Sequence, residues 1–455
     1  MNRFPDSPPD DRRPRPSSQN EPLPRAKLAQ LTRTQEMIDL IQSAKLEDDI
    51  KDDEMLHRIY NPPSEVEELE PLSRLSMELF TDLTHGSQQM YANVKETLRR
   101  FDNRIILDSY FIVKSRMERL TGTFKVMNDM CTNGCIAYTG PFADLELCSV
   151  CNEPRYLEPT NPRKKKKARK QFTTIPLGPQ VQAQWLSRDG AERMRYLTRT
   201  TAETLRNVDV NNNVFVNTYE DICHSSDYLE AVLEGRIRED DTVVMFSLDG
   251  AQLYRDKESD CWFFIWILLN LSLKIRYKKR YVLPGGFIPG PNKPGNLEPF
   301  LLPSFRHVSA LQKEGLRAWD GSQCKWIRTH PFFLFGTADT KGLPVLSGLV
   351  GHSGKHGCRP VVYTPPRRHK PGVAMHYPAA LQPQNHDHRS YFHPDVDINT
   401  VSQPNTNEYD KNLRIVLGAA TATAYKERRL ETGISRPSIC LGLQATMTLA
   451  IPTCF

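Results

Sequence analysis

The sequence predicts an α/β protein in which a mixed-sheet core follows a helical N-terminal region and a small cysteine-rich module. Three observations support this prediction. Apolar residues recur three and four positions apart through much of residues 31–127. Four cysteines then fall within 21 residues, and four apolar, β-rich runs lie between residues 241 and 340. The 455 residues suffice for two or three domains.

Composition indicates that part of the chain lies outside any compact core. The hydrophobic fraction is 39% and the mean hydropathy is −0.53, which is low for one compact domain. Residues 1–30 are rich in Pro, Asp, Arg and Ser, so we predict a disordered tail, and they contain no apolar signal-peptide core. The longest apolar run, Cys261–Leu269, has nine residues. A membrane span needs about 20, so we interpret the run as a buried strand and expect no membrane partner.

Residues 31–127 are predicted to form a helical region with no chemistry of its own. The segments LSRLSMELFTDL and SYFIVKSRMERL carry apolar residues at helical spacing. The acidic segment EVEELEPLS interrupts the pattern before them. We therefore expect either a helical domain or a helical arm.

The next module, residues 128–157, contains the cysteines Cys131, Cys135, Cys148 and Cys151. Their pattern is Cys-x3-Cys and Cys-x2-Cys with twelve residues between the pairs, which is typical of a zinc-ribbon-like site. Four protein ligands leave no open position on the metal, so we expect a structural zinc that folds the module. The alternative is four buried cysteines without a metal. Ten cysteines in a chain with no secretory signal favour reduced thiols over disulfides.

A block of positive charge follows in residues 158–171, which we predict to be a basic linker. Its seven basic residues carry +7, more than the net charge of +6 of the whole chain, so the basic character is local. The block consists of Arg163, Lys164, Lys165, Lys166, Lys167, Arg169 and Lys170. Such a block suits the phosphates of DNA or an importin, and hence the nucleus. The alternative is a solvated linker whose charge only keeps it disordered.

The remaining elements are predicted from the apolar runs. Residues 172–240 form a mixed connecting region with one helix in PQVQAQWLSRDGAERMRYLT, and residues 241–455 hold the core. Four strands are expected in DTVVMFSLDG, CWFFIWILLNLSL, RYVLPGGFIPG and IRTHPFFLFGTAD, with a helix in PFLLPSFRHVSALQKEGLRAW before the fourth. A short helix in GLPVLSGLVG, a Pro/His-rich insertion at 360–405 and a last helix at Glu408–Thr432 follow.

This order of elements is the layout of an RNase H-like mixed-sheet core, here incomplete. In that layout the first and fourth strands are neighbours, and each ends in an acidic residue in this sequence, Asp249 and Asp339. Two such carboxylates suit Mg²⁺ or Mn²⁺, which prefer oxygen ligands and promote phosphoryl transfer. The alternative for Asp249 is an ordinary Asp-Gly turn after a strand.

Several segments in one order resemble the transposases of CACTA (En/Spm-type) DNA elements in their fungal form. They include MCTNGCIAYTGPFADLELCSVCNEPRY, LDGAQLYRDKESDCWFFIWILLNL, FIPGPNKPGNLEPFLLP, FLFGTADTKGLPVLSGLVGHSGKHGCR and YKERRLETGISRPSI. The resemblance covers about Asp108 to Phe455. It implies an RNase H-like catalytic domain with an acidic triad, Mg²⁺-dependent DNA cleavage and strand transfer at element ends, and nuclear action. Asp249 and Asp339 match the first two acids of the family, and the four cysteines match its upstream cysteine pairs.

Two departures from the family pattern matter for function. A second cysteine after Cys358 is missing, and the nearby histidines are weak substitutes; they are His352, His356 and His376. The family's third acid would lie beyond Phe455, so the resemblance implies a truncated transposase. Glu427 and Glu431, on the last predicted helix, are the remaining candidates for that role, although surface positions suit both.

Three functions are therefore open. Because the third acid is missing, we expect a transposase-derived protein that is truncated and catalytically incomplete. The alternatives are an active DNA-cleaving and strand-transferring enzyme and a non-catalytic nuclear DNA-binding or scaffold protein derived from a transposase. A third carboxylate beside Asp249 and Asp339 would favour the first function over the other two.

Overall fold

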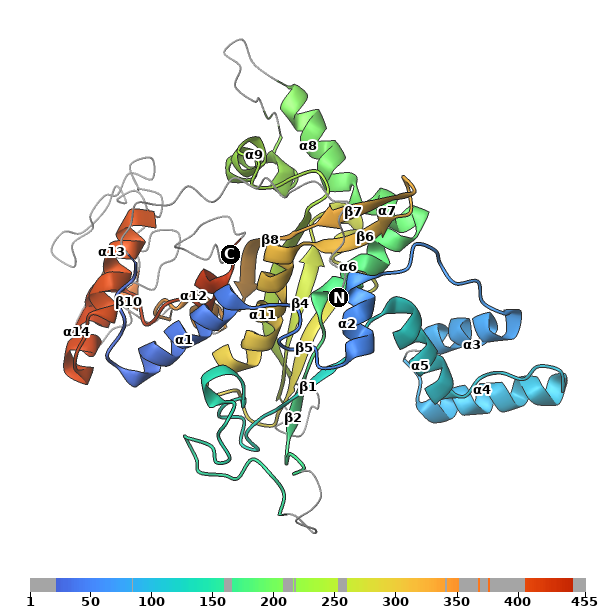
Figure 1. Cartoon of the computed structure of the whole chain (residues 1–455), viewed down its shortest axis with the longest axis horizontal. Coiled ribbons are helices and arrows are strands. Elements are labelled where there is room, and N and C mark those ends of the chain that lie inside the picture. Colours follow the sequence, from blue (N-terminus) through green and yellow to red (C-terminus); the bar gives the residue numbers. More distant parts are fainter. Residues whose placement is uncertain are drawn as a thin grey trace, which may run out of the picture.

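The centre of the protein is a six-stranded mixed sheet with the strand order β1-β2-β5-β4-β3-β8 (Figure 1). The computed structural model describes residues 22–83, 85–158, 166–207, 216, 218–252, 260–339, 342–351, 367–368, 375–376 and 406–444. The sheet strands are β1 (Val126–Asp129), β2 (Gln171–Thr174), β3 (Thr242–Gln252), β4 (Asp260–Leu268), β5 (Leu283–Pro289) and β8 (Pro331–Ala338). Two strand pairs lie outside it, β6 (Leu316–Asp320) with β7 (Lys325–Thr329) and β9 (Arg367–Arg368) with β10 (Met375–His376).

Strand direction follows from the connections. Strands β3, β4 and β5 pair antiparallel, and β8 pairs parallel with β3 after the crossover helix α11. Strands β2 and β1 extend the antiparallel side beyond β5. The first and fourth predicted core strands are therefore neighbours.

Helices cover the two faces of the sheet unequally. Apolar side chains of α1, α6 and α11 form one buried cluster with one face of β3, β4 and β8. Helices α8 and α9 cover the opposite face only near Val243 and Met245, at the start of β3. The helices before β3 are α1 (Ala29–Ser43), α2 (Asp53–Tyr60), α3 (Pro71–Asp82), α4 (Gln88–Phe101), α5 (Tyr110–Thr121), α6 (Leu177–Leu186), α7 (Arg188–Met194), α8 (Tyr196–Arg206) and α9 (Ser226–Leu233). Those after it are α10 (Leu273–Arg276), α11 (Glu298–Glu314), α12 (Leu343–Ser347), α13 (Thr406–Leu417) and α14 (Ala422–Thr432).

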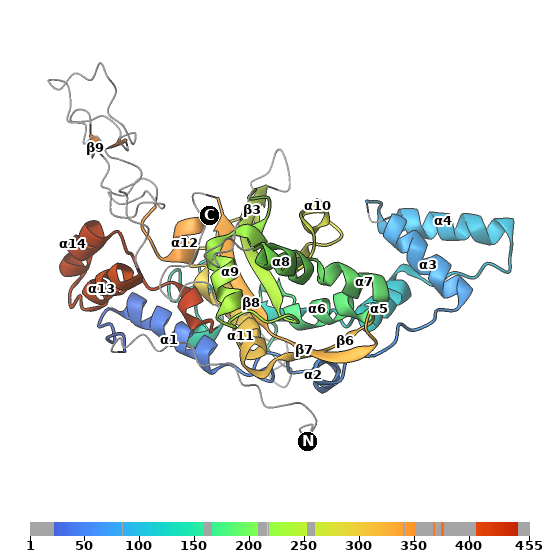
Figure 2. The ribbon, with the colours of Figure 1, turned by 90° about the horizontal axis from the view of Figure 1, so that it is seen from above.

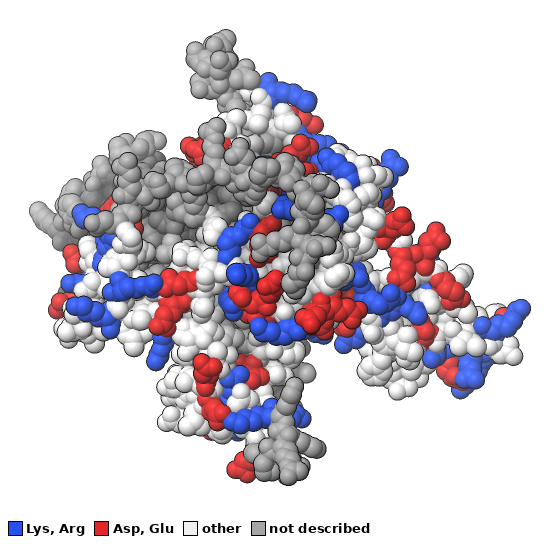
Figure 3. All heavy atoms as spheres, in the orientation of Figure 1, with Lys and Arg blue, Asp and Glu red and all other residues white. Residues whose placement is uncertain are grey.

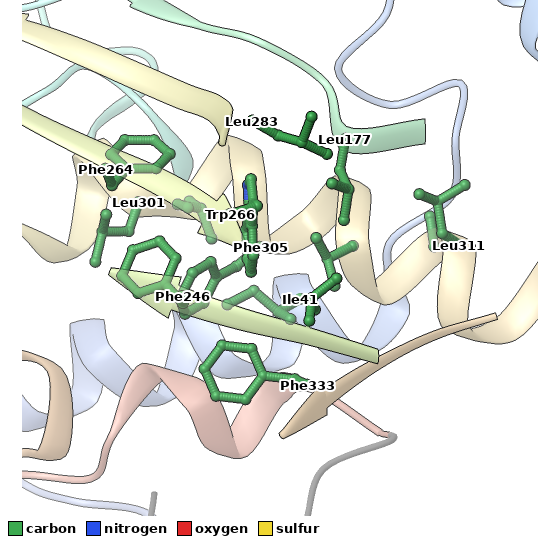
Figure 4. Close-up of a cluster of buried hydrophobic side chains, with 14 of the residues drawn as sticks. Ile41, Leu177, Phe246, Phe264, Trp266, Leu283, Leu301, Phe305, Leu311 and Phe333 are labelled. Atoms are coloured by element: carbon green, nitrogen blue, oxygen red, sulfur yellow. The ribbon is translucent and has the colours of Figure 1, made fainter. Parts of the chain in front are cut away.

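Aromatic side chains fill the larger core (Figure 4). The Phe246 ring on β3 lies 5.0 Å from that of Trp266 on β4 and 5.3 Å from that of Phe305 on α11, between ring centroids. Both contacts are edge-to-face, the arrangement that ring quadrupoles favour. Strands β3 and β4 alternate between this cluster and the opposite face, which explains why their sequences are apolar almost throughout.

The helices of residues 31–127 occupy two places. Helix α1 packs along α11, and Arg306 of α11 pairs with Asp48 and Asp49 in the turn after α1. Helices α3, α4 and α5 pack on one another and project from one side of the molecule (Figures 1 and 2). The predicted tail also differs from expectation at its end. Ala26 packs with α13, and its N–H donates to the Gln35 side chain, so residues 22–30 are ordered; residues 1–21 lie outside the described part.

Several predicted elements have other boundaries. The single helix predicted in PQVQAQWLSRDGAERMRYLT is α6, α7 and the start of α8, and the last predicted helix is divided into α13 and α14 at Gly418. Helix α11 ends at Glu314 because Gly315 has a φ of +73°, and the residues after it form the β6–β7 hairpin. The short strands β1 and β2, on either side of the cysteine module, were not predicted.

Candidate functional site

The four predicted cysteine ligands converge in the module between β1 and β2. Their Sγ atoms all lie within 4.8 Å of one another, and those of Cys131 and Cys151 are 3.5 Å apart. Tetrahedral zinc thiolates with bonds of about 2.3 Å place sulfur atoms about 3.8 Å apart. The four cysteines can therefore hold a metal ion such as zinc.

Two tight turns bring the cysteines together. In the first, the Gly134 N–H donates to the Cys131 carbonyl over 2.9 Å, and Gly134 has a φ of +74° that other residues rarely adopt. In the second, the Asn152 N–H donates to the Cys148 carbonyl over 2.9 Å, and Asn152 has a φ of +58°. Asparagine tolerates this left-handed conformation better than most residues. The turn residues noted in the sequence thus lie where each cysteine pair closes.

The thiols differ in how readily they ionise. Burial, reinforced by neighbouring thiols, raises the pKa of Cys135, and burial also raises the pKa of Cys148. For Cys151 burial acts in the same direction, but the backbone N–H of Glu153 and the neighbouring thiols outweigh it and lower the pKa to about 7. Buried thiols at this spacing cannot all ionise without a compensating cation, and a bound metal ion supplies that charge.

The cysteine module is joined to the sheet by backbone and side-chain contacts. The Gly295 and Asn296 N–H groups donate to the carbonyls of Gly134 and Cys135, which ties the module to the segment between β5 and α11. Arg155, four residues after the last cysteine, donates to Asp129 over 2.8 Å and lies 4.8 Å from the Tyr138 ring. The sequence did not single out Arg155, because nothing local distinguishes it from the exposed arginines of the chain.

The basic segment is only partly described. Arg163, Lys164 and Lys165 lie outside the described residues. The remainder pairs back on the module, since the Leu157 N–H donates to the Lys167 carbonyl and the Arg169 N–H to the Arg155 carbonyl. This part is therefore a strand-like return and not a free linker.

Three of the four described basic side chains have partners within the chain. Lys166 pairs with Glu146, and Arg169 pairs with Glu153. Lys170 donates to the carbonyls of Thr132 and Gly290, and burial lowers its pKa. Contact of this segment with DNA or an importin remains a prediction.

Asp249 and Asp339 come from neighbouring strands. Leu248 of β3 pairs with Ala338 of β8 in parallel register, and each is followed by one of the two acids. Side chains alternate between faces, so both carboxylates belong to the face opposite the aromatic core. Both residues are exposed. The acids thus lie side by side at one edge region of the sheet.

Local hydrogen bonds hold both carboxylates. Asp249 Oδ1 accepts from the Gly250 N–H over 2.8 Å, and Asp339 Oδ1 accepts from the Gly342 N–H over 2.5 Å at the start of α12. Asp249 does not begin a turn, because β3 continues to Gln252. The alternative interpretation of this Asp-Gly pair as a turn is therefore wrong.

A third ligand does not join the two acids within the part of the chain that the structure describes. There, the four cysteines are the one group of three or more His, Cys, Asp or Glu side chains with converging ligand atoms. Glu427 and Glu431 lie exposed on α14, which packs against α13. His352, His356 and Cys358 lie outside the described residues, and nothing is described of the His376 side chain.

Comparison with models of known protein families finds none that matches this chain, and comparison with curated protein sequences finds no significant match. Among the described residues, no helix has the length and apolar character needed to cross a membrane.

Proposed function

We propose that this chain is a transposase-derived protein whose RNase H-like core acts on DNA in the nucleus, as its resemblance to CACTA-element transposases implies. The observation that carries the proposal is the parallel register of β3 and β8, which makes Asp249 and Asp339 neighbours. Two acids unrelated in function would have no reason to fall at matching positions of adjacent strands and on one face.

The order of the elements adds support. Three antiparallel strands, a crossover helix and a fourth strand parallel to the first form the order β5-β4-β3-β8. The RNase H-like layout expected from the sequence requires this neighbourhood of its first and fourth strands. The additional strands β1 and β2 extend the sheet toward the cysteine module.

The acidic pair has the donor chemistry for a hard divalent cation. Carboxylate oxygens are the preferred ligands of Mg²⁺ and Mn²⁺, and their backbone hydrogen bonds restrain both groups before any metal binds. A bound ion would supply activation of water or a 3′-hydroxyl and stabilisation of the leaving oxygen. The two aspartates would hold the ion and orient it toward the open face of the sheet.

The cysteine module has a structural role in this proposal. A closed set of four thiolates leaves no coordination position for a substrate, so zinc there folds the module and does not catalyse. We expect the adjoining segment, Arg163 to Lys170, to contact phosphates or an importin.

A second function, a non-catalytic DNA-binding or scaffold protein derived from a transposase, is favoured by one observation. No third carboxylate joins Asp249 and Asp339 among the residues that the structure describes. A two-metal site normally has more than two acidic ligands.

Nicking of supercoiled plasmid DNA distinguishes the two functions. The zinc-loaded chain is incubated with Mg²⁺ or Mn²⁺ beside Asp249→Asn and Asp339→Asn, with Asp82→Asn, at an exposed position on α3, as a matched carboxylate control. We expect nicking by the wild type and by the control, and its loss in both aspartate variants. Absence of nicking by a folded, zinc-loaded wild type would favour the non-catalytic function.

A further inference from the structure

One row of side chains crosses the open face of the sheet from the acidic edge toward the cysteine module. Asp249 pairs with Phe263, Phe263 with Phe287, Phe287 with Thr173, and Thr173 with Met127. Directly paired residues point to the same face, so these five side chains form one continuous line, called here the exposed row. The Thr173 hydroxyl lies 3.4 Å from the Met127 sulfur, as expected for neighbours on one face.

Three of the five side chains in the exposed row are apolar, and the part of the chain that the structure describes leaves Asp249, Phe287 and Met127 exposed and Phe263 and Thr173 half-buried. Phe287 is 43% exposed and Met127 51% exposed, whereas Ile288, the next residue on β5, faces the opposite side and is buried. Helices α8 and α9 cover this face only at the other end of β3. Phe287 pairs with Thr173 on β2 and with Phe263 on β4, so strand pairing on both sides fixes the backbone that carries its aromatic ring.

Positive charge lies at the end of the exposed row that is far from Asp249. Lys125, two residues before Met127 and directly before β1, is exposed there. The nearby Asp129 is neutralised by Arg155, and its other oxygen accepts from Gln171 over 2.9 Å. The only carboxylate within the exposed row is Asp249, at the proposed metal site.

We propose that the exposed row binds single-stranded DNA, with bases stacked on Phe287 and Phe263 and the strand leading to Asp249. This inference rests on the proposed function, because the row ends at the proposed cleavage site. Four strand spacings of about 4.8 Å make the row about 19 Å long, enough for about five nucleotides at a stacked rise of 3.4 Å. Aromatic side chains on flat protein surfaces bind bases of any sequence by stacking.

Binding of a fluorescein-labelled oligothymidylate to the zinc-loaded full chain tests the proposal by anisotropy, without added Mg²⁺ or Mn²⁺. Phe287→Ala is expected to weaken binding about tenfold, the usual loss for one stacked base. Phe287→Leu keeps apolar area without an aromatic face and should lose nearly as much, whereas Phe287→Tyr should retain affinity. Phe101→Ala, which truncates an 86% exposed phenylalanine on the helical arm, is the matched control and should bind as the wild type does.

Three results would overturn the proposal: wild-type chain that fails to bind oligothymidylate, Phe287→Ala that binds unchanged, or Phe287→Leu that binds as tightly as the wild type. The last would mean that Phe287 contributes apolar area and does not stack on a base. Because no cleavage is measured, the outcome is separate from that of plasmid nicking.

A chemical footprint gives an independent measurement. Cys261 lies partly exposed on β4, two residues before Phe263 and on the same face, while Cys324 is exposed in the β6–β7 turn away from the row. Oligothymidylate should slow maleimide modification of Cys261 and leave Cys324 unaffected, as followed by peptide mass spectrometry. Equal modification of Cys261 with and without the oligonucleotide would contradict binding at this row.

Discussion

Loss of the metal expected at the four cysteines should destabilise the whole chain and not the module alone. The module contributes Met130, Ile136, Tyr138 and Phe142, each only 1–4% exposed, to the same buried cluster as α11 and the sheet. Exposing one such side chain costs about 1.5–3 kcal/mol, so releasing all four costs about 6–12 kcal/mol. The free energy of unfolding of a typical protein is about 5–15 kcal/mol, so little stability would remain.

The assay is urea unfolding of the full chain followed by tryptophan fluorescence, since Trp185 and Trp266 are buried. Zinc content is measured by atomic emission on the same samples. Cys148→Ser, at a fully buried ligand position, should lower both the zinc content and the unfolding midpoint. Cys324→Ser, which changes an exposed cysteine outside the module, is the matched control and should leave both unchanged.

Two results would refute this reasoning. One is a wild-type chain that purifies without metal and unfolds at the same urea concentration after zinc is added. The other is Cys148→Ser with normal stability, which would mean that the cysteines pack as ordinary apolar side chains.

Three further predictions concern the rest of the core. Arg276→Ala should lower the free energy of unfolding by about 3–5 kcal/mol in urea titrations, because it leaves the Asp221 carboxylate, which is 7% exposed, without its cation. Arg280→Ala is the control: it lies nearby, has no ion pair among the residues that the structure describes, and should change the free energy of unfolding by less than about 0.5 kcal/mol. Phe246→Ala should lower the free energy of unfolding by about 3–5 kcal/mol in the same assay, because the ring is fully buried among other aromatic rings. A loss below about 1 kcal/mol would contradict that packing. Phe101→Ala, at an exposed phenylalanine, is the control. Burial lowers the pKa of His307 to about 4, below its ordinary value of 6.5. As the pH falls from about 6.5 to about 4, the unfolded chain binds the proton first, so the free energy of unfolding should fall by about 3 kcal/mol. His307→Gln should remove that part of the pH dependence, and an identical pH profile would count against a neutral buried ring.

The parts of the fold that could be predicted depend on local pattern. The cysteine turns follow from spacing within a few residues, and the long apolar runs of β3, β4 and β8 identify strands wherever they pack. The four-residue strands β1 and β2 carry polar and apolar residues without clear alternation, so only their pairing with the sheet makes them strands. The β6–β7 hairpin was missed because the apolar spacing of α11 continues past Gly315, where the helix ends.

The two candidate sites also differ in how far they depend on local sequence pattern. The cysteine cluster was predictable because all its ligands come from one short module. The adjacency of Asp249 and Asp339 depends on the parallel pairing of strands about 90 residues apart, which only an assumed layout could supply. The exposed row was not foreseen, because Phe287 and Met127 resemble core residues in sequence and are distinguished only by which helices cover each face.

The most direct test of the acidic site is Mn²⁺ binding by the zinc-loaded chain, measured by calorimetry for the wild type, Asp249→Asn, Asp339→Asn and the double variant. If the two carboxylates share one ion, each single substitution should weaken binding at least about tenfold, and the double variant should bind little more weakly than either single variant, because the first loss already breaks the shared site. Losses that add independently, or Mn²⁺ affinity that neither substitution changes, would show that Asp249 and Asp339 do not hold a common metal ion and would contradict the account.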